Sequence, residues 1–171
     1  MPEVAILTDT VSCLPEELVK EYHINIIPVG LAINRKIYLD TEITNEEFWK
    51  LFYQTQEPVT TTAANPSDFE KIFTALAAKT DSICCIPVST QLSATGSMAA
   101  QAREAVLQKF PSLKIEIVDS KTATGAEGFI VLEAARAAAA GKSLSEVVAT
   151  AQDMVSRVKF LCAMQTLKYV V

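Results

Sequence analysis

The most regular feature of the sequence is a set of three short, mostly apolar runs, each of which ends in hydroxyl and carboxyl side chains. The runs cover residues 4–7, 83–88 and 115–118, and stretches with helical character separate them. Continuous apolar runs of this length are typical of buried parallel strands, with the intervening helices on both faces of the sheet. The pattern therefore predicts an α/β fold with a mainly parallel sheet and helices on both faces.

The polar residues that follow these runs are predicted to meet at one edge of the sheet. Parallel strands place their carboxyl ends together, and open α/β sheets bind ligands at that edge. A site built there would contain many hydroxyl groups, few charges and no histidine. The residues that the three runs bring to this edge are Thr8, Asp9, Thr10, Ser89, Thr90, Ser93, Thr95, Asp119, Ser120, Lys121 and Thr122.

Local signals place the remaining elements along the chain. Asn65 followed by Pro66 is typical of a helix start, and Ser143 with Glu146 has the spacing of a capping box. Gly141 is a candidate end for the alanine-rich helix before it. The other predicted elements are a helix from about residue 15, extended chain over 24–33 and 36–39, a helix over 46–53, a loop over 57–64, helices ending near 79, 110 and 157, and a last strand from about Phe160.

Composition narrows the class of protein. The chain has 171 residues, of which 50% are hydrophobic and 20% are charged, which fits one globular domain or one domain and part of another. The net charge of −5 and the lack of a run of lysine and arginine argue against a nucleic-acid partner. The last residues, 161–171, are apolar again where the sequence stops, which predicts a domain boundary near this point.

No segment for export or membrane insertion is evident in the sequence. The alanine-rich stretch over 123–140 is interrupted by Glu127, Glu133 and Arg136, so it is too polar to cross a bilayer. The four cysteines include no CxxC pair and are interpreted as reduced, buried thiols, which predicts a cytoplasmic location. Neither metal-ligand spacing nor a nucleotide-binding glycine motif is present, so we expect no metal and no cofactor.

Ser93 is the first candidate for chemistry, because it stands where a strand gives way to a helix. Backbone N–H groups at a helix start, together with neighbouring hydroxyls, bind anions such as carboxylate or phosphate. The alternative is that Ser93 or Thr95 only caps the helix. The adjacent Thr61 and Thr62 are the second candidate, with turn chemistry as their alternative. Asp9 and Asp119 are each the first acidic residue after a strand, and each could cap a helix as readily as act as a functional group.

A serine hydrolase is the enzymatic alternative for Ser93. The G-x-S-x-G elbow is absent, because Gln91 and Thr95 occupy its glycine positions. The only histidine, His23, is predicted at the end of the first helix, where a dipole interaction explains it better than a catalytic role.

The motifs at these residues resemble those of the DegV family, bacterial cytoplasmic proteins that bind a fatty acid. The first motif is Thr8-Asp9-Thr10 with Leu14-Pro15, and the second is Thr61-Thr62 upstream of Phe69. The third is the segment from Ser89 to Thr95, and the fourth is Asp119-Ser120 with Gly125 and Gly128 downstream. The sequence departs from the family pattern at Thr62, Ala64 and Ala94, where serine, proline and glycine are usual.

The resemblance implies a function for the chain. It implies that Thr61 and Ser93 hold the carboxylate of a long-chain fatty acid, and that the acyl tail lies between this domain and a second domain. It also implies that residues 1–171 are the N-terminal α/β domain, without the C-terminal one. Near the carboxylate we expect Thr8, Asp9, Thr62, Thr95, Asp119 and Ser120.

A partner is implied as well. A fatty-acid kinase would phosphorylate the exposed carboxylate, so the protein would be a lipid carrier rather than a catalyst. Two alternatives remain open: an acyl hydrolase or transferase that uses Ser93, and a sensor of small anions.

Overall fold

The computed structural model describes residues 3–164, and its centre is a four-stranded parallel sheet. The strands are β1 (Val4–Asp9), β2 (Asn25–Ile27), β6 (Ser82–Ile86) and β7 (Lys114–Ile117), in the order β2-β1-β6-β7. The three predicted strands are confirmed, although β6 ends before Pro87, which has no backbone N–H to continue a ladder.

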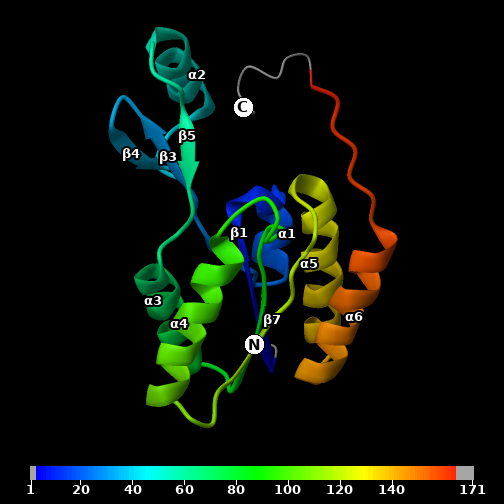
Figure 1. Ribbon diagram of the computed structural model, residues 1–171. Coiled ribbons are helices and arrows are strands. Elements are labelled where there is room, and N and C mark those ends of the chain that lie inside the picture. The colour runs from blue at the N-terminus through cyan, green and yellow to red at the C-terminus, as the bar shows by residue number, and fades with distance from the viewer. Residues whose placement is uncertain (1–2, 165–171) are drawn as a thin grey trace.

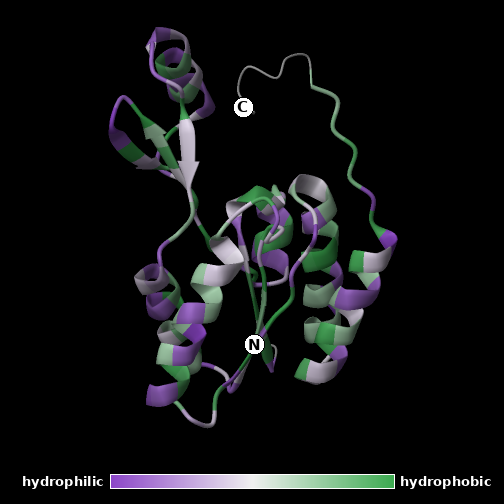
Figure 2. Cartoon of the chain, in the orientation of Figure 1, coloured by the Kyte–Doolittle hydropathy of each residue, from purple (hydrophilic) through white to green (hydrophobic). Residues whose placement is uncertain are grey.

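Helices cover both faces of this sheet, as the sequence predicts (Figure 1). The helices α1 (Glu16–Glu21), α5 (Thr124–Ala139) and α6 (Leu144–Arg157) pack on one face. The helices α3 (Pro66–Ala77) and α4 (Thr95–Lys109) pack on the other. The adjacent Cys84 and Cys85 of β6 point into these two different cores, and both thiols are buried and free. Cys13 and Cys162 are also free but are exposed, because they lie in segments outside the two cores, so the prediction of buried thiols is wrong for these two. Figure 2 shows the hydrophobic colour along the central strands, with hydrophilic residues on the helices around them.

Capping explains where several helices begin and end. The side chain of Asn65 accepts a hydrogen bond from the backbone N–H of Asp68 at 3.1 Å, and Ser143 forms the predicted capping box with Glu146. Gly141 follows α5 with a φ of 75°, a left-handed conformation in which glycine is unstrained. These three predictions are confirmed.

A second, smaller sheet projects from the carboxyl edge of the central one (Figure 1). It contains β3 (Gly30–Ile33), β4 (Lys36–Leu39) and β5 (Thr60–Thr62) in the antiparallel order β4-β3-β5, and α2 (Asn45–Gln54) lies between β4 and β5. The loop predicted over 57–64 is therefore wrong in its centre. The three β-branched residues of β5 form a strand because β3 offers them a partner, with Thr61 opposite Leu31.

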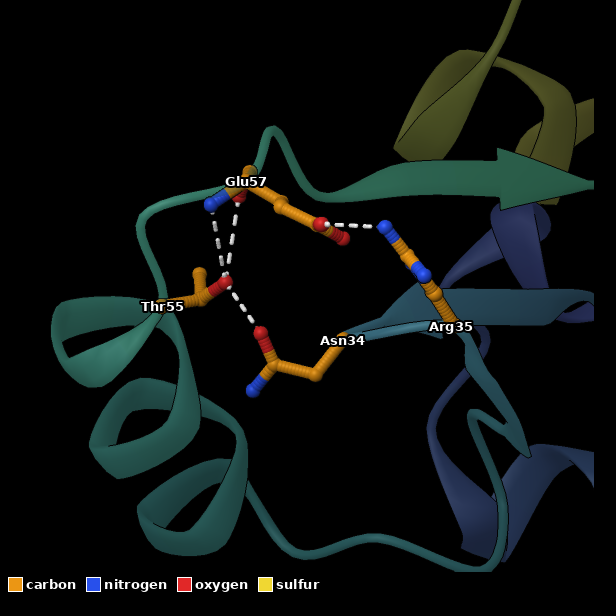
Figure 3. Close-up of polar contacts among 4 residues, drawn as sticks. All are labelled: Asn34, Arg35, Thr55 and Glu57. Atoms are coloured by element: carbon orange, nitrogen blue, oxygen red, sulfur yellow. Dashed lines mark hydrogen bonds and ion pairs between the residues drawn. The ribbon is translucent and has the colours of Figure 1, made fainter.

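Polar contacts join the tip of the β3–β4 hairpin to the connection between α2 and β5 (Figure 3). The hydroxyl of Thr55 donates to the amide oxygen of Asn34 at 2.5 Å, and Arg35 pairs with Glu57 at 3.4 Å. The small sheet and α2 are thereby linked at the end that lies farthest from the central sheet.

The strand predicted to begin near Phe160 is absent from the described chain. Residues 158–164 leave α6 without regular structure, because no neighbouring strand offers them hydrogen bonds. The rest of this prediction, over 165–171, lies outside the described residues.

Candidate functional site at the carboxyl edge of the sheet

Asp9 connects two of the loops at the carboxyl edge. Its carboxylate accepts a hydrogen bond from the backbone N–H of Val11 at 3.0 Å and another from that of Val88 at 2.9 Å. The first of these caps a short 3-10 helix, η1 (Thr10–Ser12), so the cap interpretation of Asp9 is confirmed. Because Asp9 is fully buried, it holds the loops in place rather than presenting an oxygen to a ligand.

Thr8 precedes Asp9 in β1 and is also buried. Its hydroxyl lies 2.8 Å from the carbonyl oxygen of Ile86 and 3.2 Å from Oε1 of Glu127. Glu127 belongs to α5 and is itself fully buried. The strand β1 is therefore joined to β6 on one side and to α5 on the other.

Glu127 is a residue that the sequence analysis treated only as an interruption of an apolar helix. Burial, together with the nearby charge of Asp9, raises the pKa of Glu127 to about 9, and burial also raises the pKa of Asp9 above its ordinary value. A signal was present in the sequence, because Glu127 lies three and four residues before Ile130 and Val131 and shares their apolar face.

The loop before α4 carries Ser93, which is partly buried. Its hydroxyl lies 2.8 Å from that of Thr95 and accepts a hydrogen bond from the backbone N–H of Thr95 at 3.2 Å. The N-cap position of α4 is Ala94, which has no side-chain acceptor, and Thr95 is buried. Neither Ser93 nor Thr95 therefore occupies the N-cap position, although the hydroxyl of Ser93 accepts the N–H of the first helical residue. The other N–H groups of the first turn of α4 have no intrahelical acceptor.

Asp119 and Ser120 shape the loop between β7 and α5. Asp119 accepts hydrogen bonds from the backbone N–H and the hydroxyl of Thr90 at 3.2 Å and 2.6 Å, so it does not cap a helix. The buried hydroxyl of Ser120 donates to the carbonyl oxygen of Thr122 at 3.1 Å. Both residues therefore hold backbone segments of this edge together.

Thr61 and Thr62 point to opposite faces of the small sheet, since neighbouring residues of a strand alternate. Thr61 is exposed and pairs with Leu31, whereas Thr62 is partly buried and pairs with Gly30. A side chain at position 30 would collide with the hydroxyl of Thr62, so Thr62 lies against the backbone of β3. Thr61 is the threonine of the pair that is free to meet a ligand, although no described contact joins it to Ser93.

Large apolar side chains are exposed beside these loops. Leu92 in the loop before α4 is 65% exposed, Phe129 on α5 is 60% exposed, and Leu161 in the segment after α6 is 94% exposed. A hollow of about 380 Å³ lies between this segment and the two loops, and its lining includes Ser89 and Phe160. Hydroxyl groups and an uncovered apolar surface therefore lie at the same edge of the molecule.

His23 lies far from this arrangement. It precedes β2 and lines a surface hollow at the amino edge of the sheet, together with Ala5 and Thr80. Ser93 lies at the opposite edge, beyond the carboxyl end of β6. A Ser93–His23 pair is therefore excluded. Within residues 3–164, no three histidine, cysteine or acidic side chains form a group that could hold a metal ion, and no helix is long and apolar enough to cross a membrane.

Comparison with known proteins identifies the family. A family profile described as "uncharacterised protein, DegV family" matches residues 3–171. The chain belongs to the DegV family. A DegV domain-containing protein of Caldanaerobacter subterraneus is 35% identical over 170 residues, which are 99% of this chain and 59% of that protein.

Solved structures of DegV proteins have the same fold. A DegV family protein from Thermus thermophilus, described by its fatty-acid binding, has a TM-score of 0.79 and 26% identity, over 91% of this chain and 54% of its own. The Fatty Acid Kinase B3 protein of Streptococcus pneumoniae, loaded with linoleic acid, has a TM-score of 0.76 and 19% identity, over 90% and 54% of the two chains. The chain therefore spans less than two thirds of the length of these proteins.

Proposed function

We propose that this DegV chain binds the carboxylate of a long-chain fatty acid at the carboxyl edge of its sheet, as the N-terminal part of a lipid carrier. Ser93 and Thr61 are the proposed contacts of the carboxylate. The observation that carries the proposal is the start of α4, where the hydroxyl of Ser93 adjoins helix N–H groups that Ala94 does not cap. Such a group of donors suits a carboxylate. The fatty-acid-binding description of the Thermus thermophilus relative supports the same ligand.

The apolar surface at this edge suits an acyl tail. Burying about fifteen methylenes at ~0.8 kcal/mol each gives roughly 12 kcal/mol before the costs of association, which are at least ~4 kcal/mol. Hydrogen bonds to the carboxylate add about 1.5–3 kcal/mol each. The tail therefore determines most of the affinity, and the hydroxyls determine which end of the ligand faces outward.

The longer DegV proteins suggest how the tail is covered. Leu92, Phe129 and Leu161 are exposed in this chain. The relatives are longer than this chain, and a C-terminal domain in the additional length would cover these side chains and the acyl tail. By analogy with the Streptococcus pneumoniae protein, the partner is a fatty-acid kinase that acts on the presented carboxylate. The two buried free thiols are consistent with a cytoplasmic setting for this exchange.

Titration with dodecanoate, followed by backbone amide NMR, tests the proposal. This acid stays monomeric at the concentrations that NMR requires, and NMR detects weak as well as strong binding. We expect saturable shifts at the amides of residue 61 and residues 93–97, and much smaller shifts with methyl dodecanoate, which has no carboxylate. Saturation without shifts at these amides would overturn the proposal.

The same samples distinguish the two alternatives. Inorganic phosphate that shifts residues 93–97 more strongly than dodecanoate would support a small-anion sensor. Cleavage of the methyl ester that Ser93→Ala abolishes would support the hydrolase.

A further inference from the structure

Glu127 is a buried carboxyl group for which neither the proposed ligand site nor the packing of α5 accounts. None of its surface is exposed, and its Oε2 has no hydrogen-bond partner within the described chain. Burying an ionised carboxylate without a cation or a set of donors is very costly. The arrangement around Glu127 therefore requires an explanation other than an ordinary ion pair.

The hydroxyl of Thr8 indicates where the proton lies. This hydroxyl has one hydrogen but two neighbouring oxygens, the carbonyl of Ile86 at 2.8 Å and Oε1 of Glu127 at 3.2 Å. A carbonyl oxygen only accepts, and an ionised carboxylate also only accepts. If Thr8 donates to the nearer carbonyl, its contact with Glu127 is a hydrogen bond only when Glu127 is the donor.

We propose that Glu127 is a positioning residue that keeps its proton at neutral pH and, through Thr8 and Asp9, holds the loop that carries Ser93. Asp9 interacts electrostatically with the carboxyl group of Glu127 and accepts a hydrogen bond from the backbone N–H of Val88 in that loop. The pair therefore contains one proton and one negative charge, and the charge is directed at the loop. The inference stands whether or not this edge binds a fatty acid.

The groups around the pair favour retention of the proton. Within residues 3–164, the other titratable groups that interact with the pair are Asp40, Cys13 and Cys85. Asp40 follows β4, Cys13 follows η1, and Cys85 belongs to β6. Each of these groups becomes negative when it ionises, so none of them offsets a second charge on the pair. Burial and the charge of Asp9 outweigh the hydrogen bond with Thr8, which lowers the pKa, and raise the pKa of Glu127 to about 9.

Linkage gives the proposal a measurable consequence. When the loop opens and water reaches Glu127, its carboxyl group returns to its ordinary acidity and releases its proton, whereas the closed form keeps it. Between the ordinary pKa of a glutamate and about 9, each increase of one pH unit therefore raises the equilibrium constant for opening about tenfold.

Hydrogen exchange of the Val88 and Val11 amides, both of which donate to Asp9, measures this opening. The protection factors of these two amides, which already account for the rise of the intrinsic exchange rate with pH, should fall by about a hundredfold from about pH 6 to about pH 8. In Glu127→Gln, which is neutral at every pH, they should change by less than about threefold. Glu104→Gln, at an exposed position of α4, is the matched control and should behave as the wild type.

Two results would overturn the proposal. One is an unchanged pH dependence of protection in Glu127→Gln. The other is a carbon-13 resonance of the Glu127 carboxyl that titrates near the ordinary value of about 4.3. The carbon-13 titration uses the wild-type protein, so it decides the matter even where Glu127→Gln does not fold.

Discussion

Asp119 accepts two hydrogen bonds from Thr90, one from its backbone N–H at 3.2 Å and one from its hydroxyl at 2.6 Å. The backbone N–H of Lys121 donates a third at 2.9 Å. Partial burial alone would raise the pKa of Asp119, but these hydrogen bonds outweigh it and hold the pKa below its ordinary value. The contact joins the loop that carries Ser93 to the loop between β7 and α5.

Asp119→Asn should lower the free energy of unfolding by about 1–2 kcal/mol near neutral pH, because the amide is a poorer acceptor for these three donors. The pKa of Asp119 is lower in the folded state, so its contribution is present above the ordinary value of 3.8 and disappears as the pH falls through the folded-state value. Urea denaturation at about pH 7 and about pH 3 checks both statements. The difference between the variant and the wild type should be larger at the first pH than at the second.

Thr90→Val is the matched partner variant for this test. If the hydroxyl of Thr90 acts through Asp119, the double variant should lose less stability than the sum of the two single losses. Strict additivity of the two losses would contradict the contact.

The proposed carboxylate contacts give a second prediction. Ser93→Ala and Thr61→Val should each weaken dodecanoate binding by about 1–3 kcal/mol, the range for loss of a hydrogen bond to a charged group. The NMR titration described above measures this change. Thr62→Val is the control, because Thr62 points to the opposite face of the small sheet, and it should leave affinity within about twofold. Equal losses in Thr61→Val and Thr62→Val would contradict the assignment of Thr61.

The central sheet could be predicted from the sequence because each of its signals is local. The run from Ile83 to Ile86 is apolar at each position, which requires helices on both faces, and Cys84 and Cys85 do point into different cores. The capping residues Asn65 and Ser143 act within four residues of themselves. Signals of this kind do not depend on what lies elsewhere in the chain.

The remaining features depend on partners that are distant in the sequence. Thr60–Thr62 forms a strand only because β3 lies beside it. The apolar segment after Val158 forms no strand, because no described strand lies beside it. The contact between Glu127 and Thr8 could not be predicted, because it depends on how α5 packs on β1 and the two residues are 119 positions apart in the sequence. The register of β5 with β3 determines which threonine of β5 faces outward.

Two glycines of α5 provide a third prediction about the packing beneath the site. A Cβ on Gly128 would lie 2.5 Å from the backbone carbonyl oxygen of Ser12, whereas a Cβ on Gly125 would meet no atom within 4 Å. Gly128→Ala should therefore push α5 away from η1 and cost about 1–3 kcal/mol. Gly125→Ala should be neutral or stabilising by up to about 1 kcal/mol, because alanine favours a helix. Thermal denaturation of both variants tests the contrast, and similar melting temperatures would show that α5 does not pack closely on η1.

The β3–β4 hairpin turns through two residues that are both in the left-handed conformation (Figure 3). Asn34 has a φ of 50° and Arg35 a φ of 63°, between the paired residues Ile33 and Lys36. Turns of this type favour asparagine followed by glycine, so Arg35 occupies a position at which a side chain is unfavourable. Its ion pair with Glu57 is exposed and is worth less than about 1 kcal/mol.

Arg35→Gly should therefore stabilise the protein by about 0.5–1 kcal/mol, since relief of the backbone conformation exceeds the loss of the ion pair. Arg35→Ala loses the same ion pair but keeps the unfavourable conformation, so it should be less stable than Arg35→Gly by about 1 kcal/mol. Urea denaturation of the two variants isolates the backbone effect, because neither retains the guanidinium group. Should Arg35→Gly prove no more stable than Arg35→Ala, the left-handed conformation would carry no cost, and the contacts of Asn34 and Thr55 alone would set the turn.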